Sequence, residues 1–204
     1  MQTETLSNIR SAAVNEFLEK GFQKASLRTI VKKAGVTTGA FYGYYSGKEE
    51  LFGDLTADVY HELISKYQKT LAAFEILPVS KQESNMYEFV YEGMLELNDY
   101  IYDNLTAFKL IMCCSEGTSY DGLIDEMAAF ETKATHNFVS ALSNNQLKLY
   151  PQLEQMLIVG MFSAYFEMFV HDLPREDAPE YTRQLLEFYM AGWQKIIGFN
   201  ADHD

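Results

Sequence analysis

Apolar residues recur every three or four positions along almost the whole chain, which is the spacing of an amphipathic α-helix. No stretch has the strict alternation of apolar and polar residues that marks a half-buried strand. Clusters of Gly, Ser, Asn or Pro interrupt the helical pattern at several points. The sequence therefore predicts an all-α protein of about nine helices. These helices are predicted over residues 5–20, 26–34, 38–45, 47–74, 86–104, 106–115, 122–143, 151–172 and 179–199.

The segment from Ser26 to Leu51 has the strongest local signals. Ser26 stands where its hydroxyl can accept from the free amides of a first helical turn, and Thr37 has the equivalent place before a second helix. Between them, Gly35 lies where a helix often ends in a left-handed residue, which costs glycine little. Val36 is apolar in the middle of this turn and is predicted to point inward. Two short helices around a tight corner are the pattern of a helix-turn-helix.

The second helix of this pair has one face suited to a core and another suited to solvent. Phe41 and Tyr45 lie four residues apart on the predicted core face, whereas Thr38 and Tyr42 share the solvent face. Gly39, beside them, would let the backbone approach another surface closely. The second helix is therefore the place where a partner is expected.

The residues from 20 to 48 include six basic side chains and no Asp or Glu, which suits the phosphate backbone of a nucleic acid. Arg28, at the second position of the first helix, is the strongest candidate for reading a base. Lys32 and Lys33 have a plainer alternative, because a charged pair can be merely the solvated face of a helix. The six residues are Lys20, Lys24, Arg28, Lys32, Lys33 and Lys48.

One run of motif positions holds its spacing without a gap: Ile30-x-x-x-Ala34-Gly35-Val36-Thr37-x-Gly39-x-x-Tyr42-x-x-Tyr45-x-x-Lys48-Glu49-x-Leu51. This run resembles the DNA-binding segment of the tetracycline-repressor (TetR) family of bacterial transcription regulators. Two departures, Val31 where the family usually has Ala and Tyr44-Tyr45 where His-Phe is common, keep the size and amphipathic character. The predicted DNA contacts are Ser26, Arg28, Thr37, Thr38, Gly39, Tyr42, Tyr44 and Lys48.

The net charge of −13 argues against a nucleic-acid partner until its distribution is considered. Residues 1–50 carry seven basic and five acidic groups, a net charge of +2, and residues 51–204 carry the remaining −15. An acidic body would repel DNA and orient the basic end toward it. The sequence therefore predicts a DNA-binding domain over 1–50 and an effector-binding and dimerisation domain over 51–204.

A long helix connects the two predicted domains. Ser46 and Glu49 fit a capping box at its start, in which Ser46 bonds forward and Glu49 bonds back. The helical pattern continues to about residue 74, and Pro78 interrupts the chain soon afterwards. Residues 75–85 are therefore the candidate hinge or linker.

The first three predicted helices after this linker are rich in Met and aromatic residues, which can line an adaptable pocket. A plain hydrophobic core explains the same residues when composition alone is considered. The resemblance shifts the interpretation, because members of the TetR family usually hold a small effector between helices of this domain. Glu116, Glu126 and Glu131 would favour a cationic effector, unless they are surface acids. The predicted pocket residues are Tyr91, Phe108, Met112, Met127 and Phe130.

The helix predicted over 151–172 is apolar nearly all round, so it must be buried on all sides. Gly160 and Ala164, four residues apart, permit another helix to approach closely. The last helix adds further large apolar residues, which a monomer of this size would hardly cover. In the TetR family, these two helices of each subunit form a four-helix dimer contact. The resemblance therefore implies a dimer interface that includes Leu157, Gly160, Met161, Ala164, Tyr165, Tyr189 and Trp193.

Other classes of protein lack support in the sequence. No zinc-ligand spacing, Gly-rich phosphate loop or Ser-His-Asp order occurs, so we expect no metal, no cofactor and no enzymatic activity. The polar, acid-bearing N-terminus is not a signal peptide, and the longest uncharged apolar run, 155–166, is too short to cross a bilayer. The two adjacent cysteines suit a reducing cytoplasm.

The leading interpretation is a homodimeric repressor that a small molecule releases from a near-palindromic operator in double-stranded DNA. A ligand-independent DNA-binding protein of the nucleoid type is the first alternative. A helical enzyme or carrier that keeps the first domain for oligomerisation is the second, and the lack of a catalytic constellation weighs against it. The expected switch is a tilt of the long connecting helix, which would change the spacing of the two DNA-binding domains of a dimer.

Overall fold

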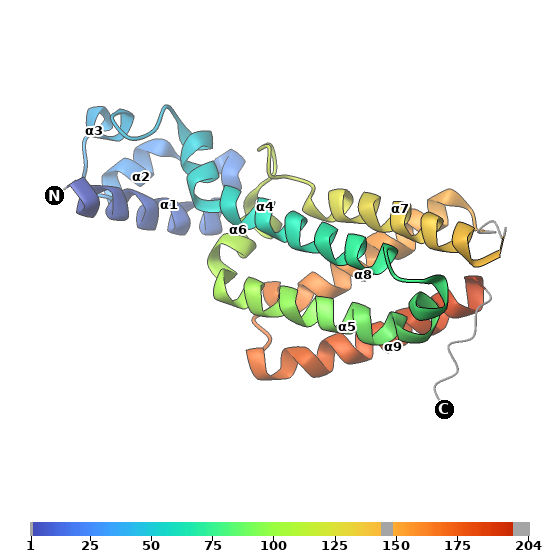
Figure 1. Cartoon of the computed structure of the whole chain (residues 1–204). Helices are drawn as coiled ribbons and strands as arrows, with labels where there is room; N and C mark the ends of the chain where they lie inside the picture. The colour runs from blue at the N-terminus through green and yellow to red at the C-terminus, as the bar shows by residue number, and fades with distance from the viewer. Residues whose placement is uncertain (1, 144–148, 198–204) are drawn as a thin grey trace. The chain divides into compact units, whose positions relative to one another are not determined.

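The computed structural model describes residues 2–143 and 149–197, and in these ranges it contains nine α-helices, one 3-10 helix and no strand. The all-α prediction is therefore confirmed. Figure 1 shows the helices in chain order. They are α1 (Gln2–Lys24), α2 (Leu27–Lys33), α3 (Thr38–Tyr42), α4 (Lys48–Glu75), α5 (Val79–Asp103), α6 (Leu105–Cys114), α7 (Leu123–Ser143), α8 (Pro151–Val170), the 3-10 helix η1 (Arg175–Asp177) and α9 (Ala178–Ile197).

The helices form two compact units. Unit 1 contains residues 1–62 and 104–123, and unit 2 contains residues 63–103 and 124–204. The helix α6 therefore belongs to unit 1 although it follows α5 in the sequence, and α4 begins in unit 1 and ends in unit 2. The division of function predicted from the sequence, at residue 50, stays a prediction.

The core of unit 1 is built on three aromatic rings in mutual edge-to-face or tilted contact. Phe52 of α4 lies with its ring centroid 5.1 Å from that of Phe17 and 5.4 Å from that of Phe22. Gly21, with φ of +71°, breaks the regular path of α1 and returns Phe22 to this core, which a side chain at residue 21 would resist. Leu110 and Cys114 of α6 complete the same core. The three N-terminal helices thus have the additional support that so small a unit needs.

The start of α4 differs in one contact from the prediction. The backbone amide of Ser46 donates to a carboxylate oxygen of Glu50 at 2.6 Å, whereas the sequence analysis gave this role to Glu49. The reason is that α4 begins at Lys48, which makes Glu50 the third residue of the helix, the position from which an acid reaches back. Acceptance of this hydrogen bond lowers the pKa of Glu50.

The predicted linker over 75–85 is too long. Only residues 76–78 separate α4 from α5, since Pro78 directly precedes the new helix that starts at Val79. The side-chain amide of Gln82 donates to the carbonyl oxygens of Phe74, Glu75 and Leu77, at 3.0 to 3.1 Å. Gln82 thereby satisfies the free carbonyls at the end of α4, which is how a glutamine comes to be buried.

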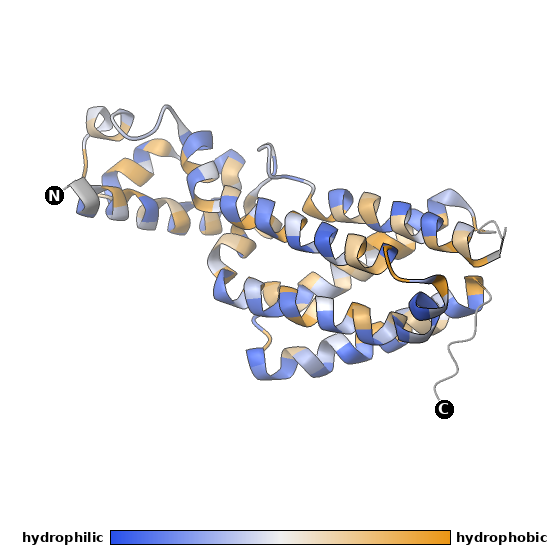
Figure 2. Ribbon diagram, viewed as in Figure 1, coloured by the Kyte–Doolittle hydropathy of each residue, from blue (hydrophilic) through white to orange (hydrophobic). Residues whose placement is uncertain are grey.

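Unit 2 is a bundle of α5, α7, α8, α9 and the last turns of α4. Figure 2 shows that its helices carry both hydrophobic and hydrophilic positions, as amphipathic helices do. A buried polar network joins three of them: the hydroxyl of Tyr165 donates to Asn98 at 2.6 Å, and the amide of Asn98 donates to Thr182 at 3.0 Å. Because all three side chains are buried and satisfied, this network fixes how α5, α8 and α9 meet.

One described helix, α8, is long and apolar enough to cross a bilayer by these two measures. The sequence analysis judged the uncharged run 155–166 too short to cross a bilayer, but α8 extends beyond this run at both ends. Within unit 2, however, Ile158, Phe162 and Phe166 of α8 are buried among the other helices. This packing is what a core helix requires, and it favours that interpretation over a membrane span.

Candidate functional site

The helix-turn-helix is set by two capping residues and one glycine. The hydroxyl of Ser26 accepts from the amide of Thr29 at 3.4 Å, and the hydroxyl of Thr37 accepts from the amide of Ala40 at 3.1 Å. Gly35, between the two helices, has φ of +68°, a conformation that other residues rarely adopt. Both caps and the glycine turn predicted from the sequence are confirmed. Since each hydroxyl caps its own helix, Ser26 and Thr37 position the recognition helix α3, and direct contact of either with DNA stays a prediction.

The helix α3 offers the surface that the sequence analysis expected. Phe41 is fully buried, whereas Thr38, Gly39 and Tyr42 are exposed, the last with 56% of its surface accessible. Tyr44 is half-buried and packs against the core of unit 1. A short, exposed face with glycine and hydroxyl groups can lie against the edges of bases in a major groove.

The basic segment has fewer free charges than its composition suggests. Lys33 donates to Glu16 at 3.1 Å and lies 3.6 Å from Glu19, and this pairing raises the pKa of Lys33. Lys20 is paired with Glu19 as well. Both acids precede the acid-free segment in the sequence and reach it across α1. Lys33 is exposed, as in the alternative of a solvated helix face, but its charge is paired with the buried acid Glu16.

Arg28, Lys24 and Lys32 are the exposed basic residues of this segment that take part in no ion pair within the described ranges. Arg28 lies on the second position of α2, so it keeps the placement from which the sequence analysis predicts a base contact. The phosphate-binding charge of this surface is expected to come from Lys24 and Lys32.

Lys48 has a different set of partners from the predicted phosphate. Its ammonium group donates to the carbonyl oxygens of Phe22, Gln23 and Ala25, the last two at 3.2 Å, and lies 4.4 Å from the centre of the Phe22 ring. These three acceptors match its three N–H donors. Partial burial lowers the pKa of Lys48. Lys48 therefore caps the end of α1, and its predicted contact with DNA remains untested.

Replacing Lys48 with alanine should lower the free energy of unfolding by about 2 kcal/mol, because three carbonyls lose a charged donor. A direct phosphate contact would in addition lower the salt slope of DNA binding by about one unit. Chemical denaturation and a salt titration of DNA binding measure the two effects separately. Lys32→Ala is the control for the change in stability, since it removes an exposed lysine of the same segment that has no capping role. A Lys48→Ala protein with unchanged stability would contradict the capping role.

A second network near α3 has no sequence signal. Arg10 of α1 donates through Nε and Nη2 to the two carboxylate oxygens of Asp54, both at 2.6 Å, and the hydroxyl of Tyr45 donates to the same carboxylate at 2.6 Å. The pair lowers the pKa of Asp54, and burial together with Asp54 raises the pKa of Tyr45 to about 12. The network fixes the chain just after α3 to both α1 and α4. Arg10 and Asp54 are 44 residues apart, which explains why the spacing of residues in the sequence did not reveal this network.

We expect Asp54→Asn to destabilise unit 1 by about 0.5–1 kcal/mol at neutral pH, a small value because water screens a partly exposed pair. The folded-state pKa of Asp54 lies below its unfolded value, so the stabilisation is present above the unfolded pKa. It is lost progressively as the pH falls below the unfolded pKa of about 3.9, and the wild type and variant should converge once the pH is below the folded pKa. Urea denaturation at a series of pH values measures this, with the exposed Asp58→Asn as control. A gap that persists under acid would contradict the assignment.

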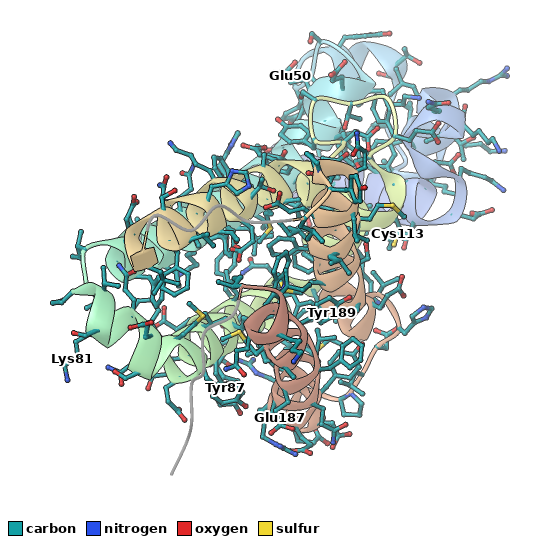
Figure 3. The ribbon with its side chains drawn as sticks, turned by 90° about the vertical axis from the view of Figure 1, so that its right-hand side faces the viewer. Glu50, Lys81, Tyr87, Cys113, Glu187 and Tyr189 are labelled. Atoms are coloured by element: carbon teal, nitrogen blue, oxygen red, sulfur yellow. The ribbon has the colours of Figure 1, made fainter. Side chains whose placement is uncertain are left out.

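Unit 2 encloses a cavity of about 140 Å³, lined by residues of α4, α5, α7, α8 and α9. Its walls are mostly aromatic and aliphatic, with Phe74 of α4, Phe89 of α5, Phe138 of α7 and Trp193 of α9 among them. Figure 3 shows α9 with Tyr189, which lines the cavity, and Glu187 on a different side of the helix. An apolar cavity with few polar groups is the usual form of a site for a small molecule.

None of the five predicted pocket residues lines this cavity. Tyr91 of α5 instead donates to the carbonyl of Pro179 at 3.3 Å, and Met127 is buried in the core of the bundle. Phe130 is half-buried, and Phe108 and Met112 are on α6 in unit 1. Two of the three helices that contain the predicted residues, α5 and α7, do contribute to the cavity, but through other residues. Contact of the five with an effector stays a prediction without support from the lining.

The cavity contains one carboxyl group, that of Glu131 on α7. The hydroxyl of Tyr67 on α4 donates to Glu131; Tyr67 is buried, and Glu131 is half-buried in the wall of the cavity. Burial raises the pKa of Glu131, and the hydrogen bond from Tyr67 opposes this rise. The interpretation of Glu131 as a surface acid is therefore wrong.

The predicted dimer residues divide between two sides of α8 and α9. Tyr165 is fully buried, and Met161, Tyr189 and Trp193 line the cavity, so these four face the inside of unit 2. Leu157, Gly160 and Ala164 are half-buried. Four other apolar residues of these two helices are not in the predicted set: Met156 and Phe188, which are 71% and 75% exposed, and Leu153 and Ile196, which are also exposed.

Gly160 permits a close approach within the chain itself. A Cβ atom at residue 160 would lie 3.3 Å from the hydroxyl oxygen of Tyr189 on α9. A bulky residue there would therefore disturb α9 of the same chain before it met any partner. The exposed apolar residues of α8 and α9, namely Leu153, Met156, Phe188 and Ile196, are the better candidates for a contact between subunits, and we call them the outer face.

Within residues 2–143 and 149–197, no group of three or more His, Cys, Asp or Glu is placed to hold a metal ion. His136, which the sequence showed without a ligand partner, lies 2.9 Å from the buried carboxylate of Glu154. This single pair joins α7 to α8 and explains the acid inside an apolar helix.

Comparison with known proteins bears on unit 1 first. The model of a family described as bacterial regulatory proteins, tetR family, matches residues 9–55. An uncharacterized HTH-type transcriptional regulator of Bacillus subtilis, YdgC, is 40% identical over 68 residues, which are 33% of this chain and 34% of that protein. SrpR, an HTH-type transcriptional regulator of Pseudomonas putida, is 40% identical over 60 residues, 29% of this chain and 28% of that protein. The matched segment thus spans about a third of the length of these relatives.

Comparison with solved structures extends over most of the chain and shows the fold. A gamma-butyrolactone receptor described as ArpA-like is 14% identical, covers 97% of this chain and 98% of its own, and has a TM-score of 0.54. A TetR-like transcriptional regulator of Rhodococcus sp. RHA1 is 18% identical, covers 92% and 96%, and has a TM-score of 0.50. The helix-turn-helix is therefore built from residues that match the tetR family of bacterial regulatory proteins, and the fold of most of the chain is similar to that of these two solved structures.

Proposed function

We propose that the chain is a DNA-binding transcriptional regulator that acts as a homodimeric repressor and is released from its operator by a small molecule. The observation that carries the proposal is the exposed face of α3, which a pair of caps and a glycine turn present at the surface of unit 1. Its proposed partner, chromosomal DNA, would place the protein in the cytoplasm. That the protein represses transcription, and does not activate it, is supported by the family resemblance.

The cavity of unit 2 supports the response to a small molecule. The residues that line a void of about 140 Å³ have no neighbouring atoms on the side of the cavity. They therefore lack van der Waals contacts, which a bound ligand would restore. Four of the lining residues come from the last turns of α4, the helix that begins in unit 1. A ligand that prefers one position of α4 by about 1–3 kcal/mol would give a useful change in DNA affinity. This supports a ligand-dependent regulator over the nucleoid-type alternative.

The experiment that tests the DNA-binding proposal is selection of duplexes from a random library, followed by fluorescence anisotropy at fixed salt. We expect a near-palindromic site, because a two-fold dimer presents the same surface to each half-site. Uniform affinity for all duplexes would instead favour the nucleoid-type alternative.

Arg28→Ala should weaken binding to the selected site by about 1–3 kcal/mol and relax the sequence preference at one position of each half-site. Lys24→Ala is the matched control, since an exposed lysine that contacts phosphate should weaken all sequences alike and lower the salt slope. Selection repeated with each variant separates the two outcomes. An Arg28→Ala protein with an unchanged selected sequence would contradict the base contact.

A further inference from the structure

Among the described residues, the cavity of unit 2 holds a single acid and no base. These lining residues include no Lys, Arg, His or Asp, and apart from Glu131 their titratable groups are the hydroxyls of Tyr67, Tyr165 and Tyr189. Glu131 is half-buried, and an ionised carboxylate in a mostly apolar wall loses part of its hydration, so it is retained at a cost in stability. A group of this kind calls for a reason beyond packing.

The hydrogen bonds of Glu131 are incomplete. One carboxylate oxygen, Oε2, accepts from the hydroxyl of Tyr67, and among the described residues no donor reaches the other oxygen, Oε1. A carboxylate has acceptor capacity for about four hydrogen bonds, so most of this capacity is left open on the side of the cavity. The site is therefore prepared for a positively charged or hydrogen-donating group.

The remainder of the wall is suited to the same kind of group. Aromatic rings carry negative charge on their faces and attract a cation most strongly where water is excluded. Six aromatic side chains from five helices contribute to the lining in addition to the two tyrosines Tyr67 and Tyr165: Phe74, Phe89, Phe138, Phe162, Tyr189 and Trp193. The aromatic wall would hold the apolar part of a ligand and share the stabilisation of its charge.

The size of the cavity limits the ligand. One water molecule needs about 10–15 Å³ of this kind of volume, so about 140 Å³ has room for roughly ten non-hydrogen atoms. From these observations we propose that the cavity binds a small apolar molecule with a single positive charge, which pairs with Glu131. The inference rests on the proposed function, whose effector it assigns to a chemical class.

The test uses a pair of probes that differ in charge and hardly in shape. Benzyltrimethylammonium is the cation, and neopentylbenzene is its neutral isostere, with carbon in place of nitrogen. Isothermal titration of each into the full chain, without DNA, measures binding alone. Glu131→Gln should weaken binding of the cation by about tenfold or more and change the affinity for the neutral probe by less than about twofold. The reason is that the substitution removes the charge while it keeps an acceptor for Tyr67. Glu96→Gln, an exposed acid of α5 outside the cavity, should change neither value.

A pH series on the wild-type protein gives an independent readout. Burial raises the pKa of Glu131, so below that pKa the carboxyl is neutral and above it ionised. The charge of the quaternary probe does not change with pH, and its affinity should therefore rise with pH and level off once Glu131 is ionised. The affinity of the neutral probe should stay constant or fall over the same range, between about pH 5 and 9, where the tyrosines remain protonated.

The outcomes separate the ligand class from the proposed function. Equal loss of both probes in Glu131→Gln, tighter binding of the neutral probe at all pH values, or binding of neither probe would overturn the cationic class. Binding of the cation through Glu131 with no effect on DNA affinity would support the cationic class and overturn regulation by this cavity. Release of DNA by the cation, reversed in Glu131→Gln, would support both.

Discussion

Replacement of Phe41 with alanine should unfold the recognition helix and abolish DNA binding. The Phe41 side chain is fully buried and contacts the ring of Tyr45 at 5.7 Å between centroids, so its loss leaves a cavity in the core of unit 1. Truncation of a buried Phe costs about 3–5 kcal/mol, which is a large part of the stability of a small unit. Hydrogen exchange of the amides in α2 and α3, together with fluorescence anisotropy of labelled DNA, measures the two effects.

The adjacent residue provides the control. Tyr42→Ala removes an aromatic ring of similar size from the exposed side of α3, and we expect a change in stability of less than about 1 kcal/mol. Its DNA affinity should nevertheless fall by about tenfold, because the lost hydroxyl and ring belong to the binding surface. A Phe41→Ala protein that binds DNA as tightly as the wild type would show that α3 is not the recognition element. Full affinity in Tyr42→Ala would remove only the contact assigned to Tyr42.

Replacement of Phe188 with glutamate should convert the dimer into a monomer. Phe188 is 75% exposed on α9, and on the outer face it would be covered by the partner subunit. A carboxylate buried there without a partner costs several kcal/mol, so the dissociation constant of the dimer should rise by at least about a hundredfold. Analytical ultracentrifugation across a range of protein concentrations measures this constant directly.

The control for this experiment is Ile76→Glu. Ile76 is also apolar and 83% exposed, but it lies in the short turn between α4 and α5 and so belongs to neither helix of the outer face. The same change in charge there should leave the dissociation constant unchanged. A wild-type protein that sediments as a monomer at micromolar concentration would contradict the dimer itself, and dissociation by both variants would point to net charge as the cause.

Local signals account for the parts of the structure that the sequence predicted well. Helical periodicity, the caps Ser26 and Thr37 and the turn at Gly35 each depend on residues within a few positions of one another. The same holds for the exposed face of α3, because burial of Phe41 fixes the direction of Tyr42 next to it. The family resemblance covers this segment as well, so both kinds of evidence are strongest in the same place.

The cavity was not predictable in this way, for a different reason on each helix. On α5 the error is one of rotation: Tyr91 lies about 200° around the helix from the lining residue Phe89. On α7 the error is one of position, since Met127 lies one turn before the lining residue Glu131. Phe108 and Met112 belong to α6, which packs in unit 1. Rotation, axial position and choice of unit are set by contacts between distant segments, which one sequence does not specify.

The long-range polar contacts were hidden for the same reason. Arg10 and Asp54, Lys33 and Glu16, and Tyr67 and Glu131 are each separated by 17 residues or more, and none of these pairs forms a recognisable motif. Charge counting treated Lys33 as free and Glu131 as one of several acids. In the fold, Lys33 is paired with Glu16, and Glu131 is the acid that lines the cavity.

Because α8 and α9 contribute both to the cavity and to the proposed dimer contact, the response to a ligand would depend on the amount of protein in the cell. Met161 and Tyr189 line the cavity, and Met156 and Phe188 on the same two helices are exposed. In the proposed dimer, a ligand that shifts either helix would also change the free energy of dimerisation, and by thermodynamic linkage dimerisation would change the affinity for the ligand by the same factor. The concentration of ligand needed for a response would then depend on how much of the regulator is present. A cell could thus adjust the threshold of its response through expression of the regulator alone, without any change in the binding site.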